Sequence, residues 1–223
     1  MHIPVLLTSI LMLATQVCFS QHYGSFKDPR DGHVYKTVKI GNQVWMAKNL
    51  DVSTFRNGDP IPHAKTDEEW EQAGYKGQPA WCYYDNNPSI GKTYGKLYNI
   101  WAISDPRGLA PAGWKIPSDT DWTILSNFLG GDVNYSGHKL KNTTGWNLDG
   151  SGDGNNTSGF SALPGGIRYG HGLFYYRDYH GYWWSQMDRR AHSWYRFLYY
   201  TDGLFRKFDF HWDAGMSVRC IKN

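Results

Sequence analysis

The sequence predicts a loop-rich α+β fold, and three observations support this class. Two segments carry the capping signal of a helix start, a hydroxyl residue followed three positions later by an acidic one: Thr66 with Glu69, and Ser118 with Asp121. Short runs dense in aromatic residues recur between turn-forming residues in the last part of the chain, which is typical of antiparallel strands. The stretch 144–172 is rich in Gly, Asn, Ser and Asp and predicts irregular loops.

The first twenty residues predict a secretory signal peptide. Met1 to Ser20 contains no Lys, Arg, Asp or Glu, and its apolar centre is shorter than the roughly 20 residues that a membrane-spanning helix needs. Cleavage is expected after Ser20. Lipidation at Cys18 is the alternative, which the bulky Val17 before it disfavours. We therefore expect export to the periplasm, the cell surface or the medium, with no membrane segment after removal of the leader.

Residues 21–223 predict one domain. Their composition shows no low-complexity linker and no internal repeat. The formal net charge of +3 is too small to indicate a nucleic-acid or membrane-surface partner. A carbohydrate or a cell-surface protein is the expected partner, on the basis of the aromatic C-terminal segment discussed below.

Two cysteines follow the leader, Cys82 and Cys220. In an oxidising compartment a disulfide between them would close a long loop and contribute about 4 kcal/mol in the chain-entropy model. Two separate buried thiols are the alternative, because sequence does not show that the two Cα atoms come close enough.

The first elements are a hairpin and two helices. Residues 33–40 alternate as a half-buried strand, and a turn at Gly41-Asn42 leads into a second strand at 43–46. One helix is expected from Thr66 to Gly74 and another from Ser118 to Gly130-Gly131. The second presents a core-facing stripe of Trp122, Leu125, Phe128 and Leu129. Residues 94–103 carry a weaker helical signal.

The C-terminal third predicts five short strands. They cover 173–176, 182–185, 194–200, 204–208 and 216–221. Turn residues such as Thr201-Asp202-Gly203 separate them. An antiparallel arrangement follows from these short connections.

Motifs spread over nearly the whole of residues 21–223 resemble the Fibrobacter succinogenes major paralogous domain. They are Tyr35 to Gln43, Trp45 to Leu50, Tyr94 to Asn99, Gly113 to Asp119 with Trp122, Leu129 to Gly131, Lys139 to Lys141, Gly159 to Arg168, Gly181 to Ser185, and Ser217 to Cys220. The resemblance implies a C-type lectin-like fold, shared with formylglycine-generating enzymes and with variable proteins diversified by retroelements. It implies a compact domain whose ends approach each other, with two main helices packed on small twisted antiparallel sheets.

One position departs from that family. The family often has a Cys just before its Pro-x-Gly-Trp motif, where this chain has Ala110 before Pro111. If that Cys pairs with the terminal one in the family, the resemblance implies that Cys220 lacks its usual partner.

Catalysis is not expected from these residues. Copper-dependent formylglycine-generating relatives need two close thiolates as Cu(I) ligands, and only Cys220 lies in the C-terminal region. The sequence shows no Cys-His pairing, zinc-spaced His cluster or phosphate-binding Gly-rich loop. We expect a non-catalytic protein without cofactor or metal, with a degenerate oxidase-like enzyme as the least favoured alternative.

Calcium binding at Asp149 to Asn155 is left open. The segment has the oxygen-rich, glycine-containing start of a calcium loop, but Phe160 stands where an EF-hand needs its bidentate Glu. A solvated, turn-rich loop is the favoured interpretation.

The aromatic C-terminal segment predicts a ligand-binding surface. Residues 194–200 are apolar on both faces of a strand, so one face needs a cover other than the core. Tyr, Trp and Arg dominate binding hot spots. The predicted ligand-binding residues are Tyr195, Arg196, Phe197, Tyr199, Phe205, Lys207, Asp209, Phe210, His211 and Trp212.

We therefore expect an exported binding module, with carbohydrate slightly favoured over protein as its ligand. A structural or envelope-associated domain packed against a protein partner is the first alternative. A receptor-binding protein diversified by a retroelement is the second, because adenine-directed mutagenesis of Asn codons reaches many residue types found between Tyr195 and Asp213, although not Lys207 or Trp212.

Overall fold

The computed structural model describes residues 21–132, 135–149, 154–187, 194–209 and 214–223. Its strands are β1 (His22–Lys27), β2 (Val34–Ile40), β3 (Gln43–Met46), β4 (Trp81–Cys82), β5 (Leu97–Tyr98), β6 (Trp114–Lys115), β7 (Gly165–Arg168), β8 (Phe174–Arg177), β9 (His180–Trp184), β10 (Trp194–Tyr199), β11 (Arg206–Asp209) and β12 (Ile221–Lys222). Its helices are α1 (Asp67–Tyr75), α2 (Pro88–Tyr94), α3 (Ile100–Ser104), α4 (Asp119–Phe128) and α5 (Ser136–Leu140), with a 3-10 turn η1 (Tyr84–Asn86). The expected mixture of helices, several sheets and long loops is confirmed.

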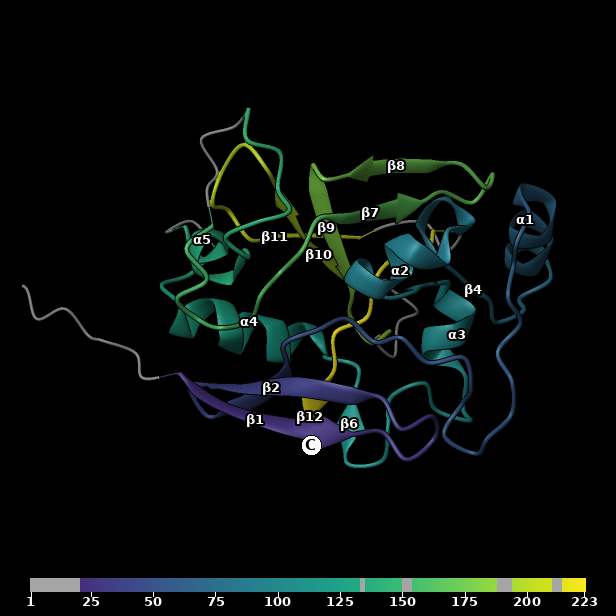
Figure 1. Ribbon diagram of the computed structural model, residues 1–223, viewed down its shortest axis with the longest axis horizontal. Coiled ribbons are helices and arrows are strands. Elements are labelled where there is room, and N and C mark those ends of the chain that lie inside the picture. The colour runs from purple at the N-terminus through teal and green to yellow at the C-terminus, as the bar shows by residue number, and fades with distance from the viewer. Residues whose placement is uncertain (1–20, 133–134, 150–153, 188–193, 210–213) are drawn as a thin grey trace, which may run out of the picture.

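The first sheet joins the two ends of the domain. Its strand order is β1-β2-β3-β12-β6, so the C-terminal strand lies between the N-terminal hairpin and β6 (Figure 1). The predicted hairpin is confirmed, with Thr37 opposite Met46 and Ile40 opposite Gln43. In β12, Ile221 pairs with both Trp45 and Lys115. The ends of the domain therefore approach each other, as expected.

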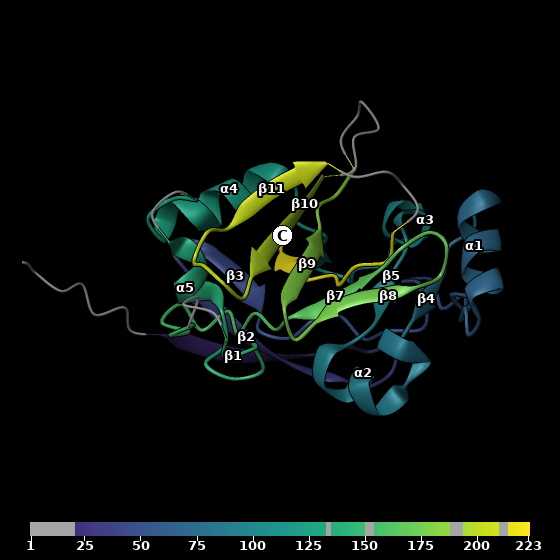
Figure 2. The same cartoon turned by 90° about the horizontal axis from the view of Figure 1, so that it is seen from above.

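The second sheet has the order β11-β10-β9-β7-β8 and lies above the first in Figure 1. Strand β10 is antiparallel to β9 and β11, and the C-terminal aromatic runs form β8 to β11 close to their predicted positions. The last predicted strand is shorter than expected, because only Ile221 and Lys222 form β12. Figure 2 shows β7 and β8 side by side, with α2 below them and α1 beyond their far end.

The two predicted helices begin where their capping boxes lie. Thr66 accepts a hydrogen bond from Glu69 N, and Ser118 accepts one from Asp121 N; in each case the acidic side chain bonds back to the cap. Trp122, Leu125 and Leu129 are buried, but Phe128 is 42% exposed, so the core-facing stripe is narrower than expected.

The single helix predicted over 94–103 is wrong. Gly95, with φ of 75°, ends α2, and Leu97 and Tyr98 then pair with β4 as β5. Asn99 caps α3 by accepting a hydrogen bond from Ala102 N. Pairing with β4 thus outweighs the local helical spacing.

Besides β5, four strands were not expected: β1, β4, β6 and β7. Strand β7 lies inside the segment predicted as loop, and all four of its residues are buried. At Gly166, φ is 68°, and a Cβ would lie 2.6 Å from both Tyr175 O and the Tyr84 ring. Glycine at this position therefore allows β8 and η1 to approach β7 closely. Because glycine has no side chain, it also removes the alternating pattern that would have predicted a strand.

The core consists of three clusters of buried residues. The largest joins the first sheet, residues 97–116 and the inner part of the second sheet. A second contains Trp45, Trp122, Phe160 and Trp183 and lies between α4 and the two sheets. A third, smaller cluster packs α1 against β4 and β5.

Cys82 and Cys220 are free and buried in different clusters. Burial raises the pKa of each thiol to about 12. The structure therefore has the two separate thiols rather than the disulfide.

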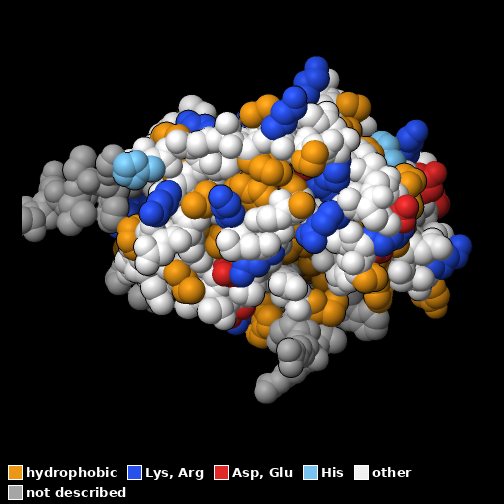
Figure 3. All heavy atoms as spheres, turned by 90° about the horizontal axis from the view of Figure 1, so that it is seen from below, with side chains coloured by type: hydrophobic (Ala, Val, Ile, Leu, Met, Phe, Trp, Pro, Cys, Tyr) orange, Lys and Arg blue, Asp and Glu red, His pale blue; other side chains and the backbone are white. Residues whose placement is uncertain are grey.

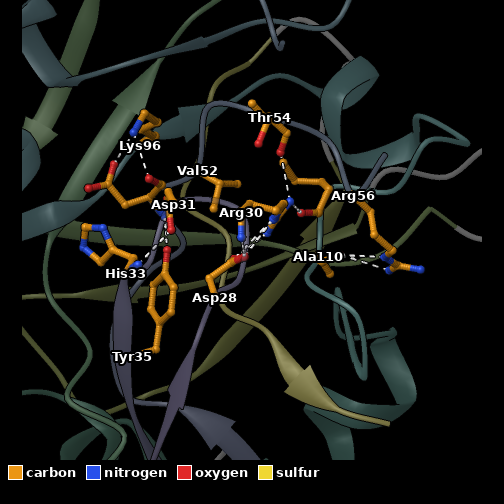
Figure 4. A network of polar contacts seen from close by, with 12 residues as sticks. Asp28, Arg30, Asp31, His33, Tyr35, Val52, Thr54, Arg56, Lys96 and Ala110 are labelled. Atoms are coloured by element: carbon orange, nitrogen blue, oxygen red, sulfur yellow. Dashed lines mark hydrogen bonds and ion pairs between the residues drawn. The ribbon is translucent and has the colours of Figure 1, made fainter. Parts of the chain in front are cut away.

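A polar network ties the N-terminal segment to the loop that follows β3 (Figure 4). Asp28 is completely buried and its carboxylate lies 2.7 Å from Arg30 Nη2. Arg30 also donates to Thr54 O and Leu109 O, and Lys96 Nζ donates to Asp51 Oδ1 at 2.5 Å. These contacts hold the loop 51–56 against the start of β2.

In the part of the chain that the structure describes, no helix has the length and apolar character to cross a membrane.

Candidate binding site

The predicted ligand-binding residues fall into three groups. Arg196 and Phe205 are 1% exposed, and Tyr195 and Phe197 are 7% exposed, so the exposure expected of them is contradicted. Tyr199 is half-buried, while Lys207 and Asp209 are exposed. Phe210, His211 and Trp212 lie outside the described residues.

Arg196 and Phe205 are buried because they join β10 and β11 to α4. Arg196 Nη1 lies 3.0 Å from Asp132, and Nη2 lies 3.3 Å from Asp119. The Phe205 ring packs edge-on against Trp122 at 5.7 Å. These two side chains hold the second sheet on the helix.

One face of β10 continues across β9 as a band of rings. Tyr195, Phe197 and Tyr199 lie opposite Trp184, Tyr182 and His180. The band is buried at Trp184 and becomes half-buried at His180 and Tyr199. It therefore opens toward the surface at the end of the sheet near the β8–β9 turn.

At that end the rings continue into β8 and the turns beside it. The Tyr176 ring stacks on His180 at 4.5 Å, and His180 lies 4.3 Å from the Tyr199 ring. Tyr175 lies 5.8 Å from Tyr176 and 5.3 Å from Tyr169. We call these five residues the aromatic strip. Tyr175 is 37% exposed and Tyr176 44% exposed, so the strip presents ring surface to solvent.

The backbone that carries Tyr176 has an unfavourable conformation. Tyr176 has φ of 66° and Asp178 has φ of 70°, both in the left-handed region that costs a non-glycine residue about 1–2 kcal/mol. Asp178 Oδ1 accepts a hydrogen bond from Tyr94 OH at 2.7 Å, and Asp178 N donates to Pro164 O. These bonds fix the turn and so hold the Tyr176 ring over His180.

Arg206 lies at the edge of the aromatic strip, and His180 within the strip is neutral at pH 7. Arg206 lies 4.8 Å over the Tyr199 ring and is held by Asp202 at 2.8 Å. Burial, together with the positive charge of Arg206, lowers the pKa of His180 to about 4. His180 Nδ1 is 2.8 Å from Tyr182 OH. At neutral pH the strip thus consists of uncharged rings with one guanidinium at its edge.

A cleft of about 680 Å³ adjoins the strip. Its lining comes from the end of α1, from α3 and from the β7–β8 turn: Glu71, Gly74, Tyr75, Lys76, Gly77, Trp101, Gly170 and His171. The Trp101 indole donates to Gly74 O at 3.1 Å, which fixes its ring beside the helix end. The His171 ring lies 5.8 Å from Tyr169 and 6.2 Å from Tyr175. His171 is therefore the point where cleft and strip meet.

Sequence reasoning found only Tyr199 among the strip residues. Tyr175 and Tyr176 were recognised as strand residues, but Tyr169 and His171 both lie in the Gly-rich segment that predicted loops. The available signal was the frequency of aromatic residues between 169 and 182, where Tyr and Phe recur as they do in the C-terminal segment. It was outweighed by the longer C-terminal run.

The calcium segment is only partly visible. Residues 150–153 lie outside the described residues, while Asp149 N donates to Asn147 Oδ1 in an exposed turn. Among the described residues, no group of three or more His, Cys, Asp or Glu side chains is placed to hold a metal ion.

Comparison with known proteins gives one match. The model of the Fibrobacter succinogenes major domain family matches residues 38–222. Searches of curated proteins and of solved structures gave no match.

Proposed function

Because the chain belongs to the Fibrobacter succinogenes major domain family, whose motifs run through both sheets, we propose that it is a non-catalytic binding module that recognises carbohydrate through the aromatic strip and the adjoining cleft. The observation that carries this proposal is the continuous series of ring contacts from Tyr169 to Tyr199 on the second sheet and the turn that follows β7. The side chains gathered there are rings and one arginine, a set suited to stacking rather than to proton or group transfer.

Tyrosine rings match the two kinds of surface that a sugar offers. Each ring gives a flat apolar face for the C–H side of a pyranose and a hydroxyl for its polar edge. Because β8 to β10 hold the rings in place, little side-chain entropy is lost when a ligand binds. The conformational entropy lost by the strip on binding is therefore small, as expected of a preorganised site.

The cleft supports a ligand of more than one sugar unit. Its volume of about 680 Å³ lies within the range of about 300–1,000 Å³ that is usual for small-molecule sites. Glu71, Lys76 and His171 offer charged and polar groups, while Tyr75 and Trp101 offer rings. A glycan chain that fills the cleft continues past His171 onto the strip.

The test is a glycan array followed by calorimetry on any hit. The variant Tyr175→Ala, Tyr199→Ala removes two rings of the strip, and we expect it to weaken binding by about 30-fold or more, as hot-spot residues do. Tyr23→Ala is the matched control, because Tyr23 is 44% exposed but lies on β1 of the first sheet. Equal binding by wild type and by the folded strip variant would overturn the proposal.

A protein ligand is the second candidate, and two exposed apolar side chains favour it. Phe208 is 55% exposed and lies 6.2 Å from Tyr195, and Leu173 is 49% exposed at the β7–β8 turn. A structural or envelope-associated role would use these side chains with the strip against a neighbouring protein. Two results together would establish this alternative. The protein would bind no glycan, and it would capture one purified envelope protein in an interaction that Phe208→Ala and Tyr175→Ala abolish.

Retroelement-driven variation is a weaker candidate. A variable receptor surface needs exposed positions, whereas Arg196 and Phe205 are buried scaffold contacts. Comparing the codons of residues 194–213 among isolates tests it, and a variation rate equal to that of the remaining chain would exclude it.

We also propose export and a C-type lectin-like arrangement. The uncharged apolar segment Met1 to Ser20 supports export as a signal peptide. The sharing of one sheet by β1, β2, β3 and β12, together with the two capped helices, supports the C-type lectin-like arrangement. Detecting the processed chain outside the cytoplasm tests the first, and an experimental structure tests the second.

A further inference from the structure

Arg219 is a buried cation without an acidic partner. Its side chain is 1% exposed, and its guanidinium donates only to uncharged oxygens: Asn49 Oδ1 at 2.8 and 3.1 Å, Met46 O at 3.2 Å and Phe160 O at 2.5 Å. Among the described residues, no carboxylate lies within ion-pair distance of Arg219. Burial lowers its pKa to about 9, which leaves it charged at neutral pH.

The other arginines with buried side chains have acidic partners. Arg168 pairs with Asp67 at 3.1 Å, Arg196 pairs with Asp119 and Asp132, and Arg30 pairs with Asp28 at 2.7 Å (Figure 4 shows the last pair). Burial of an unpaired charge is costly, and proteins normally offset it with an opposite charge. Arg219 therefore differs from these arginines in having only uncharged acceptors among the described residues.

A small polar pocket lies beside this arginine. It has a volume of about 190 Å³ and is lined by Lys36, Ala47, Lys48, Asn49, Thr93, Asn142, Ser161, Leu163 and Arg219. Three cations and several neutral polar side chains face it, and the lining contains no Asp or Glu. Neither Lys36 nor Lys48 pairs with a carboxylate in the described part of the chain. The pocket is therefore electropositive.

Two further details distinguish the residues that line this pocket. A guanidinium has five N–H groups, and the contacts of Arg219 use four, so one Nη2 N–H has no acceptor among the described residues. Ser161, which lines the pocket, has φ of 57° and is held in this strained conformation by Asn156, whose Oδ1 accepts from Ser161 N. Strained residues of this kind cluster at ligand sites.

We propose that this pocket binds a tetrahedral oxyanion, a sulfate or phosphate group, with Arg219 at its base and Lys36 and Lys48 at its mouth. Arginine and lysine together are the usual partners of such groups. The volume lies below the usual range for small-molecule sites, so the pocket accepts a small group of atoms rather than a whole sugar or nucleotide. This inference does not depend on the aromatic strip, since the two sites share no lining residue.

The experiment is a titration of the ¹⁵N-labelled protein followed through the Arg219 Nε–H resonance. Sodium sulfate and sodium phosphate are added in separate series, with sodium chloride holding the ionic strength constant. A saturable shift of this resonance, together with a rise of Tm that chloride alone does not cause, is the expected result.

The variants change exposed lysines, because substitutions at such positions leave the folded core intact. Lys48→Gln removes a charge at the mouth and should raise the Kd for the oxyanion about tenfold, whereas Lys39→Gln, at an exposed lysine of β2 outside the lining, should leave it unchanged. Absence of a saturable shift, or an equal effect of Lys48→Gln and Lys39→Gln, would overturn the proposal.

A third series separates the two sources of the anion. A sulfated monosaccharide is compared with inorganic sulfate at the same resonance. Saturation by inorganic sulfate alone assigns the pocket to a free ion, and saturation by both assigns it to a sulfate substituent that the pocket accepts on a larger ligand. Either result supports an oxyanion site, while no response to any of the three ligands overturns it.

Discussion

The two five-stranded sheets differ in how they place their aromatic side chains. In the first sheet Tyr35, Trp45 and Trp114 are buried, Tyr23 is an exposed ring on the edge strand β1, and lysines such as Lys36 and Lys39 occupy exposed positions of β2. Seen from the side of this sheet, Lys and Arg side chains surround apolar ones and outnumber acidic ones (Figure 3). In the second sheet the rings are not confined to the core, because the band that starts at buried Trp184 reaches the surface.

This difference indicates that the first sheet is mainly structural, whereas the second sheet presents rings at the surface. The first sheet closes the domain by joining its ends, so its rings contribute mainly to stability. The second sheet is held from behind by Arg196 and Phe205, which frees its other face to present Tyr175, Tyr176 and Tyr199. Four substitutions test this division, in order of decreasing effect.

Trp45→Ala should have the largest effect. Trp45 is fully buried and its ring lies 4.7 Å from that of Trp122, so its removal should lower the free energy of unfolding by about 3–5 kcal/mol. Tyr175→Ala on the second sheet should cost less than about 1 kcal/mol, because the ring is partly exposed. Urea unfolding measures both. Equal losses would show that the outer rings of the second sheet are also scaffold.

Gly166→Ala should cost about 2–5 kcal/mol. The left-handed backbone contributes about 1–2 kcal/mol, and the clash of a new Cβ with Tyr175 O and Tyr84 contributes about 1–3 kcal/mol. Gly113→Ala is the control, because Gly113 has φ of 79° but no atom within 4 Å of the added Cβ. Similar losses in the two variants would show that backbone strain, rather than close packing of β7 and β8, explains the glycine.

Tyr176→Asn should change stability little and binding strongly. Asn tolerates the left-handed conformation, so we expect the free energy of unfolding to stay equal or to rise by up to about 1 kcal/mol. Loss of the ring on His180 should weaken glycan binding. Tyr175→Asn, without such backbone strain, should lower stability by about 1 kcal/mol. A larger loss of stability in Tyr176→Asn than in Tyr175→Asn would make Tyr176 a folding residue.

His180 should give the smallest effect, seen as a dependence on pH. Its pKa is about 4 in the folded chain, through burial first and Arg206 second, against an unfolded value of 6.5. Between these values the unfolded chain binds more protons, so stability should fall as pH drops from about 6.5 to about 4. His180→Gln should reduce this slope, and His171→Gln, at an exposed side chain, should retain it. An unchanged slope in His180→Gln would contradict the burial of this ring.

Local signals predicted the elements that depend on neighbouring residues. The capping boxes at Thr66 and Ser118 and the turn at Gly41 act within a few positions of the chain, and all three lie where expected. Strand β5 was missed because its partner β4 lies fifteen residues away, and pairing at that distance leaves no periodic pattern in a strand of two residues.

The sequence by itself determined the family, the class of fold, the two capped helices, the first hairpin and the aromatic richness of the C-terminal third. Only the tertiary structure decided which rings are buried. Tyr195 and Tyr199 are four residues apart on the same face of β10, yet Tyr195 is covered and Tyr199 reaches the edge of the sheet. Alternation along a strand assigns a side chain to a face, but burial depends on which distant segments cover that face. For the same reason the cleft beside α1 and the pocket at Arg219 became visible only after the chain had folded.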